Sequence, residues 1–146
     1  IGGFLLFTAF FIFIFPLTRS IETATSTFSG MGLKALPSIL IYSFLQTSLP
    51  EELLFRGFLL KRLVNHMPFF FANTIQAIAF GLLHGILFAS LVSIKITLFI
   101  TLFTGAIAAY LGFVNEKKAG GSILTSWIIH ALANILSGLV AAFSLF

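Results

Sequence analysis

The chain has 146 residues, of which 59% are hydrophobic and only 8% are charged, with a formal net charge of +4 at pH 7. A soluble domain of this size carries about a quarter of its residues charged, so the composition excludes that class and is typical of an integral membrane protein. Cysteine is absent, which excludes disulfides, thiolate catalysis and cysteine-ligated zinc within this sequence.

Apolar runs separated by short polar segments predict an all-α fold, a polytopic transmembrane helical bundle with about five membrane helices. These helices are expected at residues 3–17, 33–64, 68–92, 96–114 and 123–146, with a polar turn at residues 115–122. No linker rich in proline, serine or charge divides the chain, so residues 1–146 are expected to form a single domain. The first residue is Ile1 rather than methionine, and we expect an N-terminally trimmed core of a longer protein.

The second predicted element is longer than a bilayer is thick, so it requires tilt or a break. Pro50 is the natural position for a break, because proline lacks a backbone donor and favours the first turn of a helix. Glu51 and Glu52 would then be first-turn residues of the helix that restarts there, where the positive end of the helix dipole suits carboxylates.

Basic residues indicate how the helices are oriented. Four of them, Lys61, Arg62, Lys117 and Lys118, fall on one predicted side, and three, Arg19, Lys34 and Lys95, fall on the other. The positive-inside rule favours the first group as cytoplasmic. Together with the 20 phenylalanines of this small core, the pattern leads us to expect an integral, multi-pass protein of a bacterial cell membrane.

Three charged groups within six residues need a reason to lie in such an apolar chain. Glu52 and Arg56 are four residues apart with the acid first, the favourable order for an ion pair on a helix. Glu51 lies about 100° further round the helix and is left free for chemistry. A stabilising charge network between helices would explain Glu52 and Arg56, but it would not explain Glu51.

Two later helices also carry polar groups inside apolar runs. His84 lies in the run 79–91, and His130 and Asn134 share one face of the last helix. Taken separately, each is explained by hydrogen bonds that clamp neighbouring helices together. Taken together with Glu51, they predict one polar site, because convergence satisfies all of these groups at once.

Two kinds of chemistry suit these residues, since no serine lies in a nucleophile-elbow setting. In the first, Glu51 assisted by His84 deprotonates a water for attack on a carbonyl, and His130 and Asn134 donate hydrogen bonds to the oxyanion. In the second, Glu51, His84 and His130 bind a zinc ion that activates the water. The sequence lacks an HExxH motif, so no local signature supports zinc, and we favour the mechanism without a cofactor.

The segments that carry these residues resemble three motifs of one family. Residues 51–57, EELLFRG, look like the EExxxR motif, residues 80–84, FGLLH, like FxxxH, and residues 130–134, HALAN, like HxxxN. They are the motifs of the CAAX prenyl protease and bacteriocin-processing (CPBP) intramembrane proteases. The resemblance runs from Glu51 to Asn134, and the order and spacing of the motifs agree with the family.

The resemblance implies a glutamic-type intramembrane endopeptidase. In it Glu51 and His84 activate water, His130 and Asn134 form the oxyanion site, and Glu52 and Arg56 support them. It implies a peptide or a lipidated, prenylated protein as substrate, contact with membrane lipid, and no nucleic-acid partner. The alternative that we keep from a non-enzymatic class is a bacteriocin-immunity or scaffolding membrane protein. A proton-coupled transporter is disfavoured because no inverted repeat is apparent.

Overall fold

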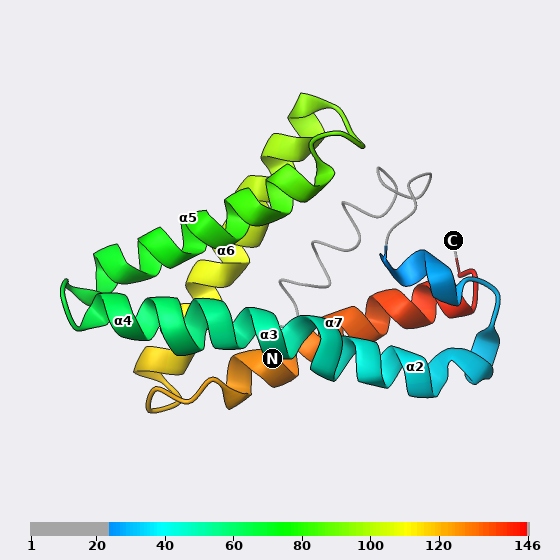
Figure 1. The fold of residues 1–146 in the computed structure, drawn as a ribbon, viewed down its shortest axis with the longest axis horizontal. Coiled ribbons are helices and arrows are strands. Elements are labelled where there is room, and N and C mark those ends of the chain that lie inside the picture. Colours follow the sequence, from blue (N-terminus) through cyan, green and yellow to red (C-terminus); the bar gives the residue numbers. More distant parts are fainter. Residues whose placement is uncertain (1–23, 146) are drawn as a thin grey trace.

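The computed structural model describes residues 24–145, and within this range every regular element is a helix (Figure 1). Two short 3₁₀ turns, η1 (Ala24–Phe28) and η2 (Gly32–Ala35), come first. A long helical rod over residues 36–64 follows them. Three α-helices complete the described chain, namely α5 (Phe69–Phe88), α6 (Ile94–Lys117) and α7 (Leu124–Ala142).

The rod alternates between α-helical and wider π-helical segments. Its parts are α2 (Leu36–Ile41), the π-helical η3 (Tyr42–Ser48), α3 (Leu49–Glu52), the π-helical η4 (Leu53–Leu60) and α4 (Lys61–Val64). The predicted break at Pro50 is wrong, because the helical backbone continues through Ser48 and Leu49 into α3. A π-turn widens the helix, which gives the proline ring room beside the preceding turn. The two glutamates of α3 therefore lie between two π-segments, which are rare and often found at functional sites.

Three helices, α5, α6 and α7, are long and apolar enough to cross a membrane. Only 28% to 39% of their most apolar windows is buried inside the protein, so most of that surface faces outward, as contact with lipid requires. They correspond to the predicted elements 68–92, 96–114 and 123–146. The prediction of about five membrane helices is not confirmed, because the element 3–17 lies outside the described residues and the rod is not one uniform α-helix.

Helices α5 and α6 form a tight hairpin whose contact is made of small residues (Figure 1). A Cβ atom added to Gly81 would overlap the backbone oxygen of Thr101, and one added to Gly85 would overlap the side chain of Thr101. Gly105 lies opposite, where an added Cβ would be 3.2 Å from the backbone oxygen of Ala77. The small residues Gly81 and Gly85 thus allow close packing of the two helices, which holds the helix that carries His84.

Replacing Gly81 with alanine is expected to destabilise the folded protein by about 1–3 kcal/mol, because backbone cannot move aside as a flexible side chain would. Gly57 provides a matched control, since a Cβ there would meet its nearest atom at 3.7 Å, an ordinary contact. Gly57→Ala is expected to be neutral or slightly stabilising in the same assay. Thermal unfolding of both variants in detergent checks the difference, and equal midpoints would contradict the packing interpretation.

Helix α7 packs along the first half of the rod and brings distant parts of the chain together (Figure 1). One buried apolar cluster joins the start of the rod to the end of α7 through Ile39 and Ala142. A second joins η4 to the hairpin through Phe55, Phe80 and Ala108. The α3 segment lies on the rod between these two clusters, so its side chains are held by packing on both sides.

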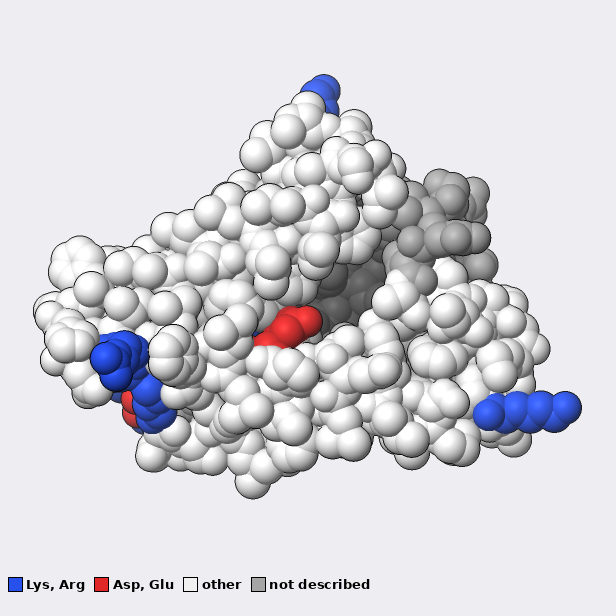
Figure 2. All heavy atoms as spheres, in the orientation of Figure 1, with Lys and Arg blue, Asp and Glu red and all other residues white. Residues whose placement is uncertain are grey.

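The lysine and arginine side chains that protrude on the face drawn in Figure 2 lie at the ends of the described structure, whereas Arg56 is buried in its middle. Lys61 Nζ is 2.7 Å from Glu116 Oε1, and Lys117 Nζ lies 4.6 Å from the centre of the Phe69 ring. These contacts place the end of the rod and the end of α6 at the same end of the molecule. The sequence predicted Lys61 and Lys117 on one side of the bundle, and in the structure they lie at the same end of the molecule.

Candidate active site

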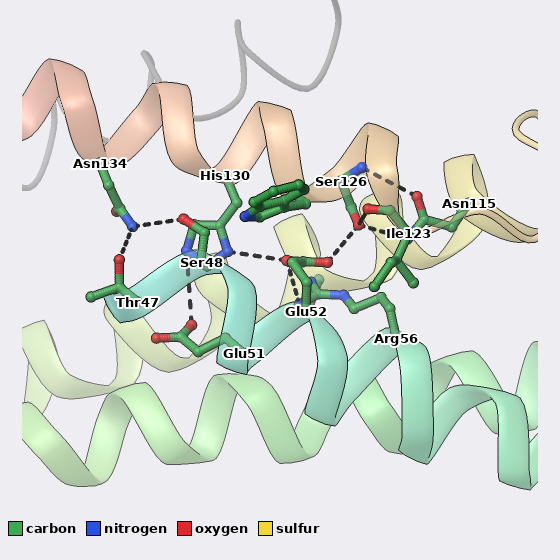
Figure 3. A network of polar contacts seen from close by, with 12 residues as sticks. Thr47, Ser48, Glu51, Glu52, Arg56, Asn115, Ile123, Ser126, His130 and Asn134 are labelled. Carbon is green, nitrogen blue, oxygen red and sulfur yellow. Dashed lines mark hydrogen bonds and ion pairs between the residues drawn. The ribbon is translucent and has the colours of Figure 1, made fainter. Parts of the chain in front are cut away.

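Three separate helical elements supply the acids and imidazoles of the candidate site, and Figure 3 shows those of the rod and of α7. Glu51 and Glu52 come from α3, His84 from α5, and His130 from α7. On the face drawn in Figure 2, acidic atoms lie in a hollow among uncharged side chains, between the hairpin and the rod. The predicted convergence of these three elements is therefore present in the fold.

Glu52 and Arg56 form a fully buried ion pair. Arg56 Nη1 donates to Glu52 Oε1 at 3.0 Å, and both side chains have 0% exposed surface. The guanidinium carbon lies 4.5 Å from the centre of the Phe80 ring, a cation–π contact that α5 supplies. Arg56 is thus paired with Glu52 and not with Glu51, as the four-residue spacing predicted.

Glu51 is the less buried of the two acids, with 28% of its side chain exposed. Its Oε2 atom lies 4.0 Å from Nε2 of His84 and 3.8 Å from Nε2 of His130. Within the described chain no hydrogen-bond donor satisfies this oxygen, although the atom itself is shielded from solvent. A carboxylate oxygen and two imidazole nitrogens therefore face one another at slightly more than hydrogen-bond distance.

Nδ1 of each histidine already has a hydrogen-bond partner, and this determines whether Nε2 is a donor or an acceptor. His84 Nδ1 is 3.0 Å from the backbone oxygen of Phe80, and His130 Nδ1 is 3.0 Å from Glu52 Oε1. Both partners are pure acceptors, so Nδ1 carries the proton in each ring. In a neutral ring Nε2 is then an acceptor, and only an imidazolium has a second proton to donate towards Glu51.

Asn134 lies one turn beyond His130 on α7 and contacts the rod instead of the two glutamates (Figure 3). Its side-chain nitrogen donates to Thr47 Oγ1 at 2.8 Å and to Ser48 Oγ at 3.1 Å. Thr47 in turn donates to the backbone oxygen of Tyr42 at 3.0 Å, inside the π-segment η3. The structure therefore brings Glu51, His84 and His130 together and places Asn134 beside them with its amide protons already used.

Two polar residues of this region were not recognised in the sequence, Ser126 and Asn115. Ser126 Oγ donates to Glu52 Oε2 at 2.5 Å and accepts from Asn115 Nδ2 at 2.6 Å. The helical period contained the signal for Ser126, since residues 126, 130 and 134 recur every four positions on one face of α7. Asn115 belongs to the last turns of α6 and is 1% exposed, so its assignment to a polar turn after that helix was wrong.

Glu51, His84 and His130 are the donor set that a zinc ion would use at this site. Its chemistry suits zinc, because both histidines donate Nδ1–H to an oxygen, as metal-bound histidines do. The spacing of these atoms does not suit zinc. Two ligands of a tetrahedral zinc with bonds of about 2.1 Å lie roughly 3.4 Å apart, whereas Glu51 Oε2 lies 4.0 and 3.8 Å from the two Nε2 atoms. Among residues 24–145 no group of three or more His, Cys, Asp or Glu is placed to hold a metal ion.

Comparison with known proteins gives one match. A family model described as Rce1-like, type II CAAX prenyl endopeptidase Rce1-like, matches residues 33–136. This stretch contains the whole rod, α5, α6 and both polar residues of the last motif, His130 and Asn134. No curated protein and no solved structure matches the chain.

Proposed function

The chain belongs to the Rce1-like family of type II CAAX prenyl endopeptidases, and we propose that it hydrolyses a peptide bond with a water activated by Glu51 and His84. The family is a group of CAAX proteases, and three apolar helices make the chain a membrane protein. The observation that carries the mechanism is the separation of roles between the two acids. Glu52 is neutralised by Arg56, whereas Glu51 Oε2 makes no hydrogen bond within the described chain and lies 4.0 and 3.8 Å from the Nε2 atoms of His84 and His130.

A water molecule placed between Glu51 and His84 would donate to both, because both facing atoms are acceptors. Glu51 Oε2 and His84 Nε2 are 4.0 Å apart. Hydrogen bonds of about 2.8 Å to both atoms would meet at the water oxygen at about 90°, not far from the angle between its two O–H bonds. The two protons would then point at Glu51 and His84, which leaves a lone pair of the water oxygen to attack a carbonyl carbon.

The reaction proceeds in two balanced steps. The water oxygen forms a bond to the carbonyl carbon of the peptide, its proton passes to Glu51, and the carbonyl oxygen becomes an oxyanion. The tetrahedral intermediate then collapses, the carbon–nitrogen bond breaks, and Glu51 returns the proton to the departing nitrogen. The products are a carboxylic acid and an amine, and transfer of the acid's proton to the amine gives a carboxylate and an ammonium ion. The enzyme is regenerated without a covalent intermediate.

His130 and Asn134 are proposed to stabilise the oxyanion. His130 Nδ1–H is held by Glu52, so a donor at Nε2 requires the imidazolium form. Asn134 would exchange its longer bond, 3.1 Å to Ser48, for the oxyanion.

The substrate is proposed to be a membrane-associated peptide, with a prenylated C-terminal CaaX protein as the first candidate. The family description names prenyl endopeptidases, which supports this choice. A site that lies between helices with outward apolar surfaces also suits a lipidated chain that approaches through the bilayer. A multi-pass location in a bacterial cell membrane belongs to the same proposal.

Cleavage in proteoliposomes tests the proposed function. The purified protein is reconstituted and given a quenched fluorescent CaaX peptide with a farnesyl group, beside the same peptide without the lipid. We expect release of the C-terminal tripeptide from the farnesylated peptide, faster than any cleavage of the control. Cleavage of both peptides at equal rates would overturn the prenyl preference, and cleavage of neither would favour an immunity or scaffolding role.

A further inference from the structure

Ser126 has an unusual set of contacts for a residue that the catalytic scheme does not use. Its side chain has 0% exposed surface, and it lies in the first turn of α7, four residues before His130. Its hydroxyl is 2.5 Å from Glu52 Oε2, a short distance typical of a hydrogen bond from a hydroxyl to a charged oxygen. The remaining oxygen of Glu52, Oε1, accepts from both Arg56 and His130.

Asn115 determines the direction of this contact. Its side-chain nitrogen donates to Ser126 Oγ at 2.6 Å, and its side-chain oxygen accepts from the backbone N–H of Ser126 at 3.3 Å. The Ser126 oxygen is therefore already an acceptor, and its single proton remains for Glu52 or for the backbone oxygen of Ile123 at 3.1 Å. The shorter bond to the carboxylate is the stronger, so the proton goes to Glu52.

We propose that Ser126, held by Asn115, is a positioning residue that sets the rotation of the Glu52 carboxylate and through it the orientation of the His130 ring. This inference rests on the proposed function for its catalytic consequence. With Oε2 held by Ser126, Oε1 is directed at both Arg56 Nη1 and His130 Nδ1. The ring of His130 is then fixed with Nε2 towards Glu51, where the oxyanion donor is required.

The alternative to a positioning role is a purely structural one, because the hydrogen bonds of Ser126 also connect α7 to α6 and to the rod. In that case loss of the hydroxyl would lower stability and leave the surviving folded enzyme unchanged. A positioning role instead predicts a lower kcat at unchanged KM, since the residue does not touch substrate. The two interpretations therefore differ in the kinetics of the folded fraction.

The kinetic test compares Ser126→Ala, Ser126→Thr and Ser43→Ala in proteoliposomes. Loss of a residue that orients a catalytic group typically lowers activity by about 10- to 100-fold, so we expect that fall in kcat for Ser126→Ala. Ser126→Thr keeps the hydroxyl and is expected to restore most of the activity. Ser43 is equally buried, and its hydroxyl has no partner in the described chain, so Ser43→Ala controls for the loss of a buried hydroxyl.

A second readout does not depend on turnover. The protein has only three histidines, so ¹⁵N-histidine labelling gives few imidazole signals, and a His130→Ala variant identifies one of them. The Nδ1 proton of His130 should be strongly deshielded by Glu52 and should move or disappear in Ser126→Ala but not in Ser43→Ala. An unchanged signal together with unchanged kcat would overturn the proposal. A shifted signal in a protein that cleaves no peptide would keep the positioning and reject the proposed function.

Discussion

Glu51→Gln is expected to lower kcat by about 10²- to 10⁴-fold, which is the usual contribution of a general base. Glutamine keeps the size and the hydrogen-bonding capacity of the side chain but cannot accept the proton of the attacking water. The fold should survive, because Glu51 is 28% exposed and Arg56 is paired with Glu52. Turnover of the farnesylated peptide and thermal unfolding of the same preparation measure the two effects separately.

Glu116→Gln is the matched control for this substitution. Glu116 pairs with Lys61 at the end of the rod, where 39% of the Lys61 side chain and 16% of the Glu116 side chain are exposed, and a surface ion pair contributes about 0–1 kcal/mol to stability. Its turnover is expected to stay within about twofold of the original protein, as for most substitutions remote from a site. A Glu51→Gln protein that cleaves the peptide at the same rate as this control would remove Glu51 from the mechanism.

Arg56→Ala should destabilise the folded protein more than either Gly81→Ala or Glu51→Gln. Removing one partner of a buried ion pair typically costs about 3–5 kcal/mol, because the other charge is left uncompensated. Glu52 has 0% exposed surface and would keep only Ser126 and His130 as partners. The packing of the guanidinium on Phe80 would be lost as well.

The double variant Glu52→Gln with Arg56→Met separates the charge effect from the loss of packing. It removes both charges and retains side-chain volume, so it should be more stable than Arg56→Ala. Chemical unfolding in mild detergent, followed by tryptophan fluorescence, compares the two proteins, since the chain has one tryptophan. Equal stability of Arg56→Ala and the original protein would show that the pair makes no net contribution to the fold.

The sequence was most informative where one side chain had to satisfy a strong local rule. The order and four-residue spacing of Glu52 and Arg56 predicted their ion pair, because on any helix these positions are neighbours. The apolar runs predicted α5, α6 and α7, because the length of an apolar run is also a local property of the sequence. The small-residue spacing at Gly81 and Gly85 is likewise typical of a close helix contact, which the structure shows.

The remaining errors concern features that depend on three-dimensional contacts. Pro50 was expected to break the rod, but the helical backbone continues through it between two π-segments, and a π-segment has no local sequence signature comparable to a proline. Asn115 was placed in a turn because its neighbours are polar, whereas its partner Ser126 lies on another helix. The bond between Asn134 and Thr47 joins residues 87 positions apart, a distance over which no sequence spacing gives information.

Turnover of the metal-free protein tests the central claim most directly, because Glu51 and His84 are proposed to activate water on their own. The protein is purified with a strong chelator, its zinc content is measured by mass spectrometry, and its cleavage of the farnesylated peptide is compared before and after zinc is added. We predict full activity with far less than one zinc per chain and no gain on addition. The claim would be contradicted if activity disappeared with the metal and returned with one equivalent of zinc. In that case zinc binding should also require His84 and His130.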